Sequence, residues 1–176
     1  AYWRDYAPEK RYQMLVKWHW FMPAVTALLG YFPGRKLGWL EDTPRGVVRD
    51  WSRAGRQFGS QGLGRRTRAD IKALMKPFSG VTAATLALSV TDDEFGTVPA
   101  IERLLGYFPR SPAVHLRIAP QSVAQKRIGH FAFFNDRHED TLWRIALEWL
   151  RHGRCPSDAP GVVTKRSGPN NAASVG

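Results

Sequence analysis

Two short apolar runs, Thr85–Val90 and Ala113–Ile118, constrain the fold of this chain more than any other feature of its sequence. The first run is continuous and has turn-forming residues on both sides, which is the pattern of a strand buried on both faces of a parallel sheet. The second run predicts another strand. Between them, Thr97 and the apolar residues up to Leu105 predict a helix that Gly106 closes. The order strand, helix, strand predicts an α/β fold with a parallel sheet.

Helical periodicity predicts four further helices, over residues 8–30, 44–56, 70–76 and 140–151. Pro23 should kink or split the first of these helices, because proline removes an amide donor. Thr43 precedes a proline, so we expect it to be the N-cap of the second helix. Pro77 should end the third helix, and Gly153 should cap the last one.

The composition changes along the chain, and we expect three regions. Residues 1–82 should form a mostly helical cap, and residues 83–152 should form the strand-containing core. Residues 153–176 are mainly Gly, Pro, Ser, Ala and Asn without apolar periodicity, so we expect a disordered tail.

Charge and cysteine content exclude several classes of protein. The chain has 26 Lys and Arg against 15 Asp and Glu, a net charge of +11, and Cys155 is its sole cysteine. A single cysteine excludes a disulfide framework and favours a reducing compartment, so we expect a cytoplasmic protein. No apolar stretch approaches the roughly 20 residues that a membrane-spanning helix needs. Ala1 begins the chain without a Met or a signal-peptide pattern, and we expect a fragment of a longer protein.

Residues suited to acid–base chemistry follow the two predicted strands. Asp92 and Asp93 come shortly after the first strand, and His130 lies in the loop after the second. Because ligands bind beyond the carboxyl ends of parallel strands, we expect these side chains to share one site. An acid after one strand and a histidine after the next, in that order, is the second half of an α/β-hydrolase triad. There the histidine moves the proton, and the carboxylate orients the imidazole.

Five segments follow one another in a recognisable order: Phe32–Trp39, Asp42–Trp51, Leu86–Phe95, Ile128–Phe134 and Leu142–Trp143. Together they resemble a group of predicted bacterial α/β-hydrolases related to serine aminopeptidases and lysophospholipase-like esterases. The resemblance covers about residues 1–152. It implies a helical cap inserted after the sixth strand of the core, followed by the last two strands of the sheet. The chain would then be an incomplete domain that lacks the N-terminal half of its own fold.

The resemblance also implies roles for individual residues. Asp93 matches the triad acid by its spacing to Phe95, Asp92 is the alternative acid, and His130 matches the triad histidine. The family's G-x-S-x-G nucleophile motif is missing from the sequence. Ser60 is the nearest internal candidate, but no strand precedes it and its surroundings predict a cap loop. We therefore expect this chain alone to be inactive.

The expected reaction of the intact parent is hydrolysis of a small carboxylic ester, or of an amide. No cofactor is needed for this chemistry, and no spacing of His, Cys, Asp or Glu predicts a metal site. Helically spaced aromatic residues of the cap are candidates for lining an acyl pocket as well as for packing the cap: Trp18, Trp20, Phe21, Trp39 and Trp51.

Two other functions remain open at this point. Basic residues outnumber acidic ones between Arg35 and Lys76, so the chain could be a non-catalytic basic domain that binds nucleic acid or an anionic surface. These cations alternate with Trp and Val at helical spacing, which favours a solvated helix face, and we expect no specific nucleic-acid partner. The other possibility is a degenerate hydrolase.

Overall fold

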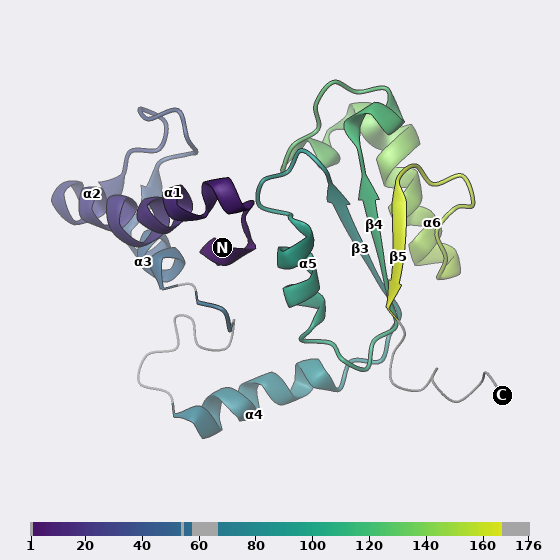
Figure 1. Ribbon diagram of the computed structural model, residues 1–176, viewed down its shortest axis with the longest axis horizontal. Helices are drawn as coiled ribbons and strands as arrows, with labels where there is room; N and C mark the ends of the chain where they lie inside the picture. Colours follow the sequence, from purple (N-terminus) through teal and green to yellow (C-terminus); the bar gives the residue numbers. More distant parts are fainter. Residues whose placement is uncertain (1, 54, 58–66, 167–176) are drawn as a thin grey trace. The chain divides into compact units, whose positions relative to one another are not determined.

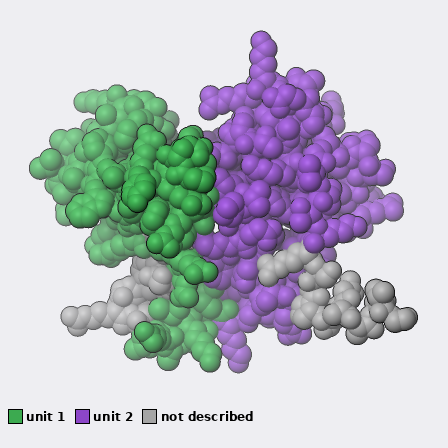
Figure 2. Space-filling model, in the orientation of Figure 1, with its two compact units in different colours: residues 1–75 green, residues 76–176 purple. Residues whose placement is uncertain are grey.

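The computed structural model of the chain describes residues 2–53, 55–57 and 67–166 (Figure 1). The chain divides into two compact units, residues 1–75 and residues 76–176 (Figure 2). Both contain helices and strands, and the second contains a three-stranded sheet. The chain therefore combines helices with a sheet, as the sequence predicts, but the three-stranded sheet is mixed, because one strand pair is parallel and the other antiparallel.

Short helices and one small antiparallel ribbon form the first unit. Its elements are η1 (Trp3–Asp5), η2 (Pro8–Lys10), α1 (Arg11–Val16), η3 (Lys17–Phe21), α2 (Met22–Leu29), β1 (Tyr31–Phe32), β2 (Thr43–Pro44) and α3 (Arg45–Ser52). Its buried apolar side chains are Tyr6, Met14, Trp18, Met22, Phe32 and Val48. Tyr6 lies between η1 and η2, and the others come from the helices and the ribbon, so together they give this unit a core of its own.

The long N-terminal helix is interrupted before Pro23. The interruption is η3, a π-helical turn over Lys17–Phe21 that joins α1 to α2. Proline cannot donate a backbone hydrogen bond, and a wider turn just before it changes the hydrogen-bond register. Gly30 then ends α2 in the left-handed conformation at φ 81°, as expected for a glycine cap.

Three predicted helix boundaries are wrong, and one of them is the end of α3, which lies at Ser52 and not near Arg56. Thr43 is not an N-cap, because it pairs with Phe32 in the β1–β2 ribbon and its hydroxyl donates to the carbonyl of Glu41 at 2.9 Å. Pro77 does not end its helix, because α4 spans Arg68–Ser79 with the proline inside. Pro77 lies in the last turn of α4, so its missing N–H removes only one hydrogen bond near the helix end.

The sheet of the second unit has the strand order β3–β4–β5 (Figure 1). Strands β3 (Thr85–Val90) and β4 (Ala113–Ile118) are parallel, and their first residues, Thr85 and Ala113, are in register. The crossover helix α5 (Val98–Leu105) joins them, and its N-cap Thr97 accepts a hydrogen bond from the amide of Ala100. Both predicted strands, their parallel pairing and the helix between them are confirmed.

A third strand follows the two strands that the resemblance implies to be the last of the sheet, and it lies inside the region predicted to be a disordered tail. Strand β5 (Val162–Arg166) pairs antiparallel with β4, which places Val163 opposite Leu116. Gly161 starts this segment at φ 114°, and a Cβ there would collide with the carbonyl of Arg117. The close approach needs glycine, and the β-branched residues that follow fill the free edge of β4. The residues predicted to be disordered after Arg166 lie outside the described part of the chain.

The helices α5 and α6 (Arg144–His152) flank the sheet on opposite sides (Figure 1). The terminal helix starts as a π turn, η8 (Glu139–Trp143), and ends at Gly153 with φ 65°. The main core lies on the α6 side of the sheet. It consists of Val90, Leu116, Ile118, Ile128, Leu142 and Ile145. Three short 3-10 turns join β4 to η8: η5 (Pro120–Val123), η6 (Ala132–Phe134) and η7 (Asp136–His138).

Candidate functional site

The structure brings Asp93 and His130 into direct contact. Asp93 lies in the turn after β3, and His130 lies in the long connection after β4. Both strands end at the same edge because they are parallel and in register up to the pair Val90 and Ile118. The Nδ1 atom of His130 is 2.8 Å from Oδ2 of Asp93. The sequence-predicted pair is therefore within hydrogen-bond distance.

The contact defines the hydrogen-bonding roles of the imidazole. An ionised carboxylate only accepts hydrogen bonds, so Nδ1 of His130 carries the proton and donates it to Asp93. When the ring is neutral, its Nε2 atom then has a free lone pair. The Asp93 side chain is 9% exposed and that of His130 is 44% exposed. The acid is thus shielded from water, whereas the histidine is accessible to a reacting group.

Asp92 has a different role from Asp93. Its Oδ2 atom accepts hydrogen bonds from the backbone amides of Ile128 and Gly129, at 2.9 and 3.0 Å. Gly129 has a left-handed backbone with φ 69°, a conformation that glycine adopts without strain. Asp92 thereby fixes the segment just before His130, while Asp93 contacts the imidazole itself. Of the two acids that the sequence leaves open, the geometry favours Asp93 as the partner of His130.

Two aromatic rings lie close to the His130 imidazole. The ring centroid of Phe95 lies 5.1 Å from that of His130, and the centroid of Phe131 lies 4.7 Å away. Phe131 is 79% exposed, so this aromatic surface extends to solvent beside the histidine. Aromatic neighbours restrict rotation of the ring and exclude water from part of it.

Four of the five cap aromatics proposed as a pocket make ring contacts with one another. Trp18 and Trp51 make an edge contact with centroids 5.6 Å apart, and Phe21 and Trp39 lie 5.4 Å apart. Trp20 is 72% exposed. The described contacts show packing pairs within the first unit, and the pocket role of these residues stays a prediction.

Several cations of the first unit are used in contacts within it. Lys17 lies over the ring of Trp39, with Nζ 4.2 Å from the centroid. Arg35 pairs with Glu41, and Arg11 donates to the carbonyl of Tyr6. These contacts reduce the number of basic side chains free to form one continuous anion-binding face.

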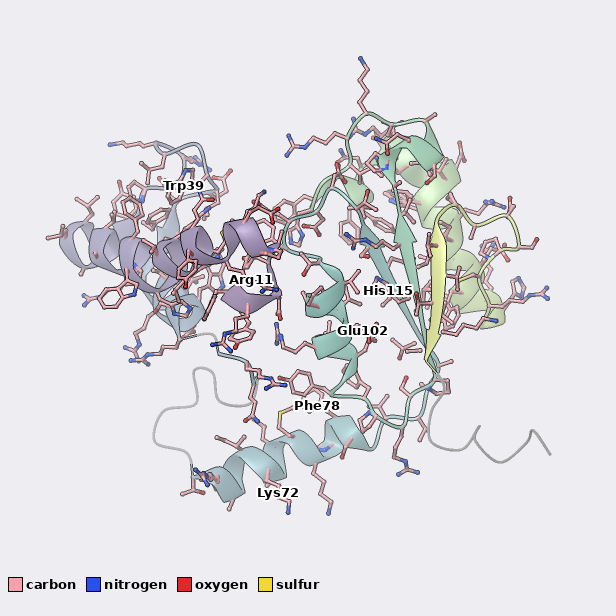
Figure 3. All side chains as sticks on the ribbon, viewed as in Figure 1. Arg11, Trp39, Lys72, Phe78, Glu102 and His115 are labelled. Atoms are coloured by element: carbon pink, nitrogen blue, oxygen red, sulfur yellow. The ribbon has the colours of Figure 1, made fainter. Side chains whose placement is uncertain are left out.

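A second polar cluster, on the α5 side of the sheet, was missed by sequence reasoning. Ser89 Oγ lies 2.8 Å from Nε2 of His115, and Arg117 Nη1 lies 3.2 Å from the same hydroxyl. Glu102 of α5 faces His115 (Figure 3), with its carboxylate 4.0 Å from Nδ1. His115 and Arg117 are two residues apart in β4 and therefore lie on the same face of the sheet. The strand register, which the sequence does not give, then places Ser89 beside them.

The serine and the histidine of this cluster are buried, whereas the Glu102 side chain is partly exposed. Ser89 is 7% exposed and His115 is 4% exposed, so a substrate cannot reach the hydroxyl. The Glu102 carboxylate lies beyond hydrogen-bond distance of the imidazole. The serine, histidine and glutamate therefore resemble a triad in residue types only, and their role is structural.

Protonation of two buried histidines should make the folded state less stable in acid. Burial lowers the pKa of His115, and burial together with the nearby Arg137 lowers the pKa of His138. The unfolded chain takes up these protons as pH falls below about 6.5, whereas the folded chain resists. The free energy of unfolding should therefore decrease from pH 7 to pH 5, with each histidine contributing up to about one proton to the slope.

Urea unfolding at several pH values measures this effect. The double variant His115→Gln, His138→Gln should show a shallower dependence on pH than the unchanged chain. An equal slope in both proteins would show that these two histidines do not cause the acid sensitivity.

Cys155 and a nearby cavity lie away from the Asp93–His130 pair. A cavity of about 600 Å³ is lined by Trp149, Cys155 and the start of β4, which is the opposite end of the strand from His130. Burial raises the pKa of the Cys155 thiol, which makes it a poor nucleophile. Within the described ranges, no three His, Cys, Asp or Glu side chains gather in a way that could hold a metal ion.

Two further sequence observations can be placed. Ser60 lies outside the described residues. Among the helices of the described ranges, none is long and apolar enough to cross a bilayer. Comparison with known proteins finds no matching family model, no matching curated protein and no matching solved structure.

Proposed function

We propose that this chain supplies the acid and the general base of a serine-hydrolase triad, with Asp93 and His130 in these roles. The observation that carries the proposal is the 2.8 Å contact between Nδ1 of His130 and the shielded carboxylate of Asp93. The nucleophilic serine comes from a segment outside residues 1–176. We call the protein that contains both parts the intact hydrolase.

The geometry supports a two-step transfer of the acyl group. The Nε2 atom of His130 takes the proton from the serine hydroxyl as the oxygen attacks the ester carbonyl, and Asp93 stabilises the imidazolium that forms. His130 then gives that proton to the departing alcohol, which leaves an acyl-enzyme. In the second step His130 takes a proton from water and returns it to the serine, releasing the carboxylic acid.

Three features support the assignment to the α/β-hydrolase type. The acid follows one parallel strand and the histidine follows the next, in the chain order of that fold. The five segments that resemble α/β-hydrolases follow one another in the same order as in that family. An intact contact between Asp93 and His130 also favours a working site over a degenerate one. We propose a carboxylic ester, or less readily an amide, as substrate, and a cytoplasmic location.

The isolated chain should fail to hydrolyse p-nitrophenyl acetate and p-nitrophenyl butyrate, because its acid–base pair has no nucleophile. Its rate should equal that of His130→Ala within error, measured by release of p-nitrophenolate. Turnover by the isolated chain that disappears in His130→Ala would contradict a nucleophile outside residues 1–176.

A further inference from the structure

The position of the Asp93 carboxylate depends on the absence of a side chain at residue 96. A Cβ on Gly96 would lie 2.5 Å from Oδ2 of Asp93 and 3.2 Å from its Cγ. Oδ2 is the atom that receives the hydrogen bond from His130. Gly96 is not among the glycines with positive φ, so alanine there meets a steric conflict without a forced backbone conformation.

The other carboxylate oxygen limits how Asp93 can respond. Its Oδ1 atom accepts the backbone N–H of Phe95 at 2.8 Å. A Cβ at residue 96 would push Oδ2 away, while the backbone N–H of Phe95 still holds Oδ1. The carboxylate would have to rotate or leave the turn, and we expect either movement to weaken the contact with His130.

Arg117 connects this turn to the sheet. Its Nη1 atom lies 3.2 Å from the carbonyl oxygen of Gly96 and 3.2 Å from Ser89 Oγ, which is itself bonded to His115. Hydrogen bonds from a charged donor are stronger than those between neutral groups. The buried polar cluster on the α5 side of the sheet thus extends to the backbone of the turn that carries Asp93.

We infer that Gly96 and Arg117 are positioning residues for Asp93: Gly96 leaves the space for Oδ2, and Arg117 anchors the Gly96 carbonyl. This inference rests on the proposed function, since it concerns the same acid–base pair. Neither residue contacts the reacting atoms. Their effect reaches the reaction through the tautomer of His130, because the imidazole can accept a proton at Nε2 only while Nδ1 holds its own.

The tautomer of His130 can be measured in the isolated chain. Long-range ¹H–¹⁵N correlation spectra of ¹⁵N-histidine-labelled protein at about pH 9, where histidines are mostly neutral, distinguish Nδ1–H from Nε2–H. The unchanged chain should show Nδ1–H, and Asp93→Asn should change this state. Gly96→Ala should lose the Nδ1–H preference, and Arg117→Gln should reduce it. Gly46→Ala, where a Cβ has nothing within 4 Å, and Arg110→Gln are the matched controls and should keep it.

The outcomes separate the two proposals. If Gly96→Ala and Arg117→Gln both keep the Nδ1–H tautomer, the positioning roles are wrong and the Asp93–His130 pair stands. If the unchanged chain and Asp93→Asn show the same tautomer, the pair itself is absent, and both the positioning roles and the proposed function are overturned. Arg117→Gln adds no side-chain atoms to the turn, so it tests the anchoring of the Gly96 carbonyl even where Gly96→Ala does not fold.

Discussion

Replacing His130 with alanine is expected to lower kcat/KM of the intact hydrolase for p-nitrophenyl butyrate by about 10⁴-fold, and Asp93→Asn by a similar factor. The first variant removes the group that takes the serine proton at Nε2. The second keeps the shape of the side chain but lets its amide donate toward Nδ1, which favours the wrong tautomer of the imidazole. Initial rates of ester hydrolysis measure both effects.

Asp92→Asn is the matched control for Asp93→Asn. Asp92 accepts from two backbone amides and does not contact the imidazole, and the asparagine carbonyl can still accept from these donors. We expect a much smaller loss of kcat/KM together with reduced stability. A loss in Asp92→Asn that equals or exceeds that of Asp93→Asn would reverse the assignment of the two acids.

Leu142→Ala is expected to destabilise the second unit by about 2–5 kcal/mol, the range for removing a large buried aliphatic side chain. Leu142 is fully buried and belongs to the core cluster that contains Leu116 and Ile128. The backbone amide of Ile128, which lies two residues before His130, donates a hydrogen bond to Asp92. The space that the Leu142→Ala substitution leaves in the core should therefore also loosen the segment that positions His130. Urea unfolding of the isolated chain measures the loss of stability.

Leu150→Ala provides the comparison for this core substitution. Leu150 lies on α6 and is 80% exposed, so its replacement should change the free energy of unfolding by less than about 0.5 kcal/mol. Equal losses in the two variants would show that the core is not organised around Leu142.

The strands and their connection could be predicted because several local signals agree at the same residues. The run at Thr85–Val90 is apolar throughout and has turn residues on both sides, and Thr97 caps the helix that follows. Parallel pairing then brings the segments after Val90 and Ile118 to one edge. The prediction that Asp92, Asp93 and His130 lie at one edge needed no more than this topology, whereas the choice of Asp93 came from the family resemblance.

Other elements depend on contacts that local sequence does not contain. In the sequence, strand β5 has Gly, Pro and Ser on both sides. It forms because the edge of β4 offers hydrogen bonds to Val162–Arg166. Thr43 has the local pattern of an N-cap, yet pairing with Phe32 places it in a ribbon. In both cases a tertiary contact outweighs local propensity.

Side-chain directions and contacts within the site could not be predicted from the sequence either. Asp92 and Asp93 are neighbours of the same type, and their roles differ only through the direction of each side chain in the turn. Ser89 and His115 are 26 positions apart, and only the strand register shows that they touch. The steric requirement at Gly96 is likewise a three-dimensional property, since its backbone conformation is ordinary.

Covalent labelling of the intact hydrolase with a fluorophosphonate tests the central claim most directly. The coding sequence is expressed together with its upstream region, and mass spectrometry locates the labelled serine in the unchanged protein and in His130→Ala. We predict a label on a serine outside residues 1–176, at a rate that falls sharply in His130→Ala. A label on a serine within residues 1–176, or a labelling rate that His130→Ala leaves unchanged, would contradict the proposed role of the Asp93–His130 pair.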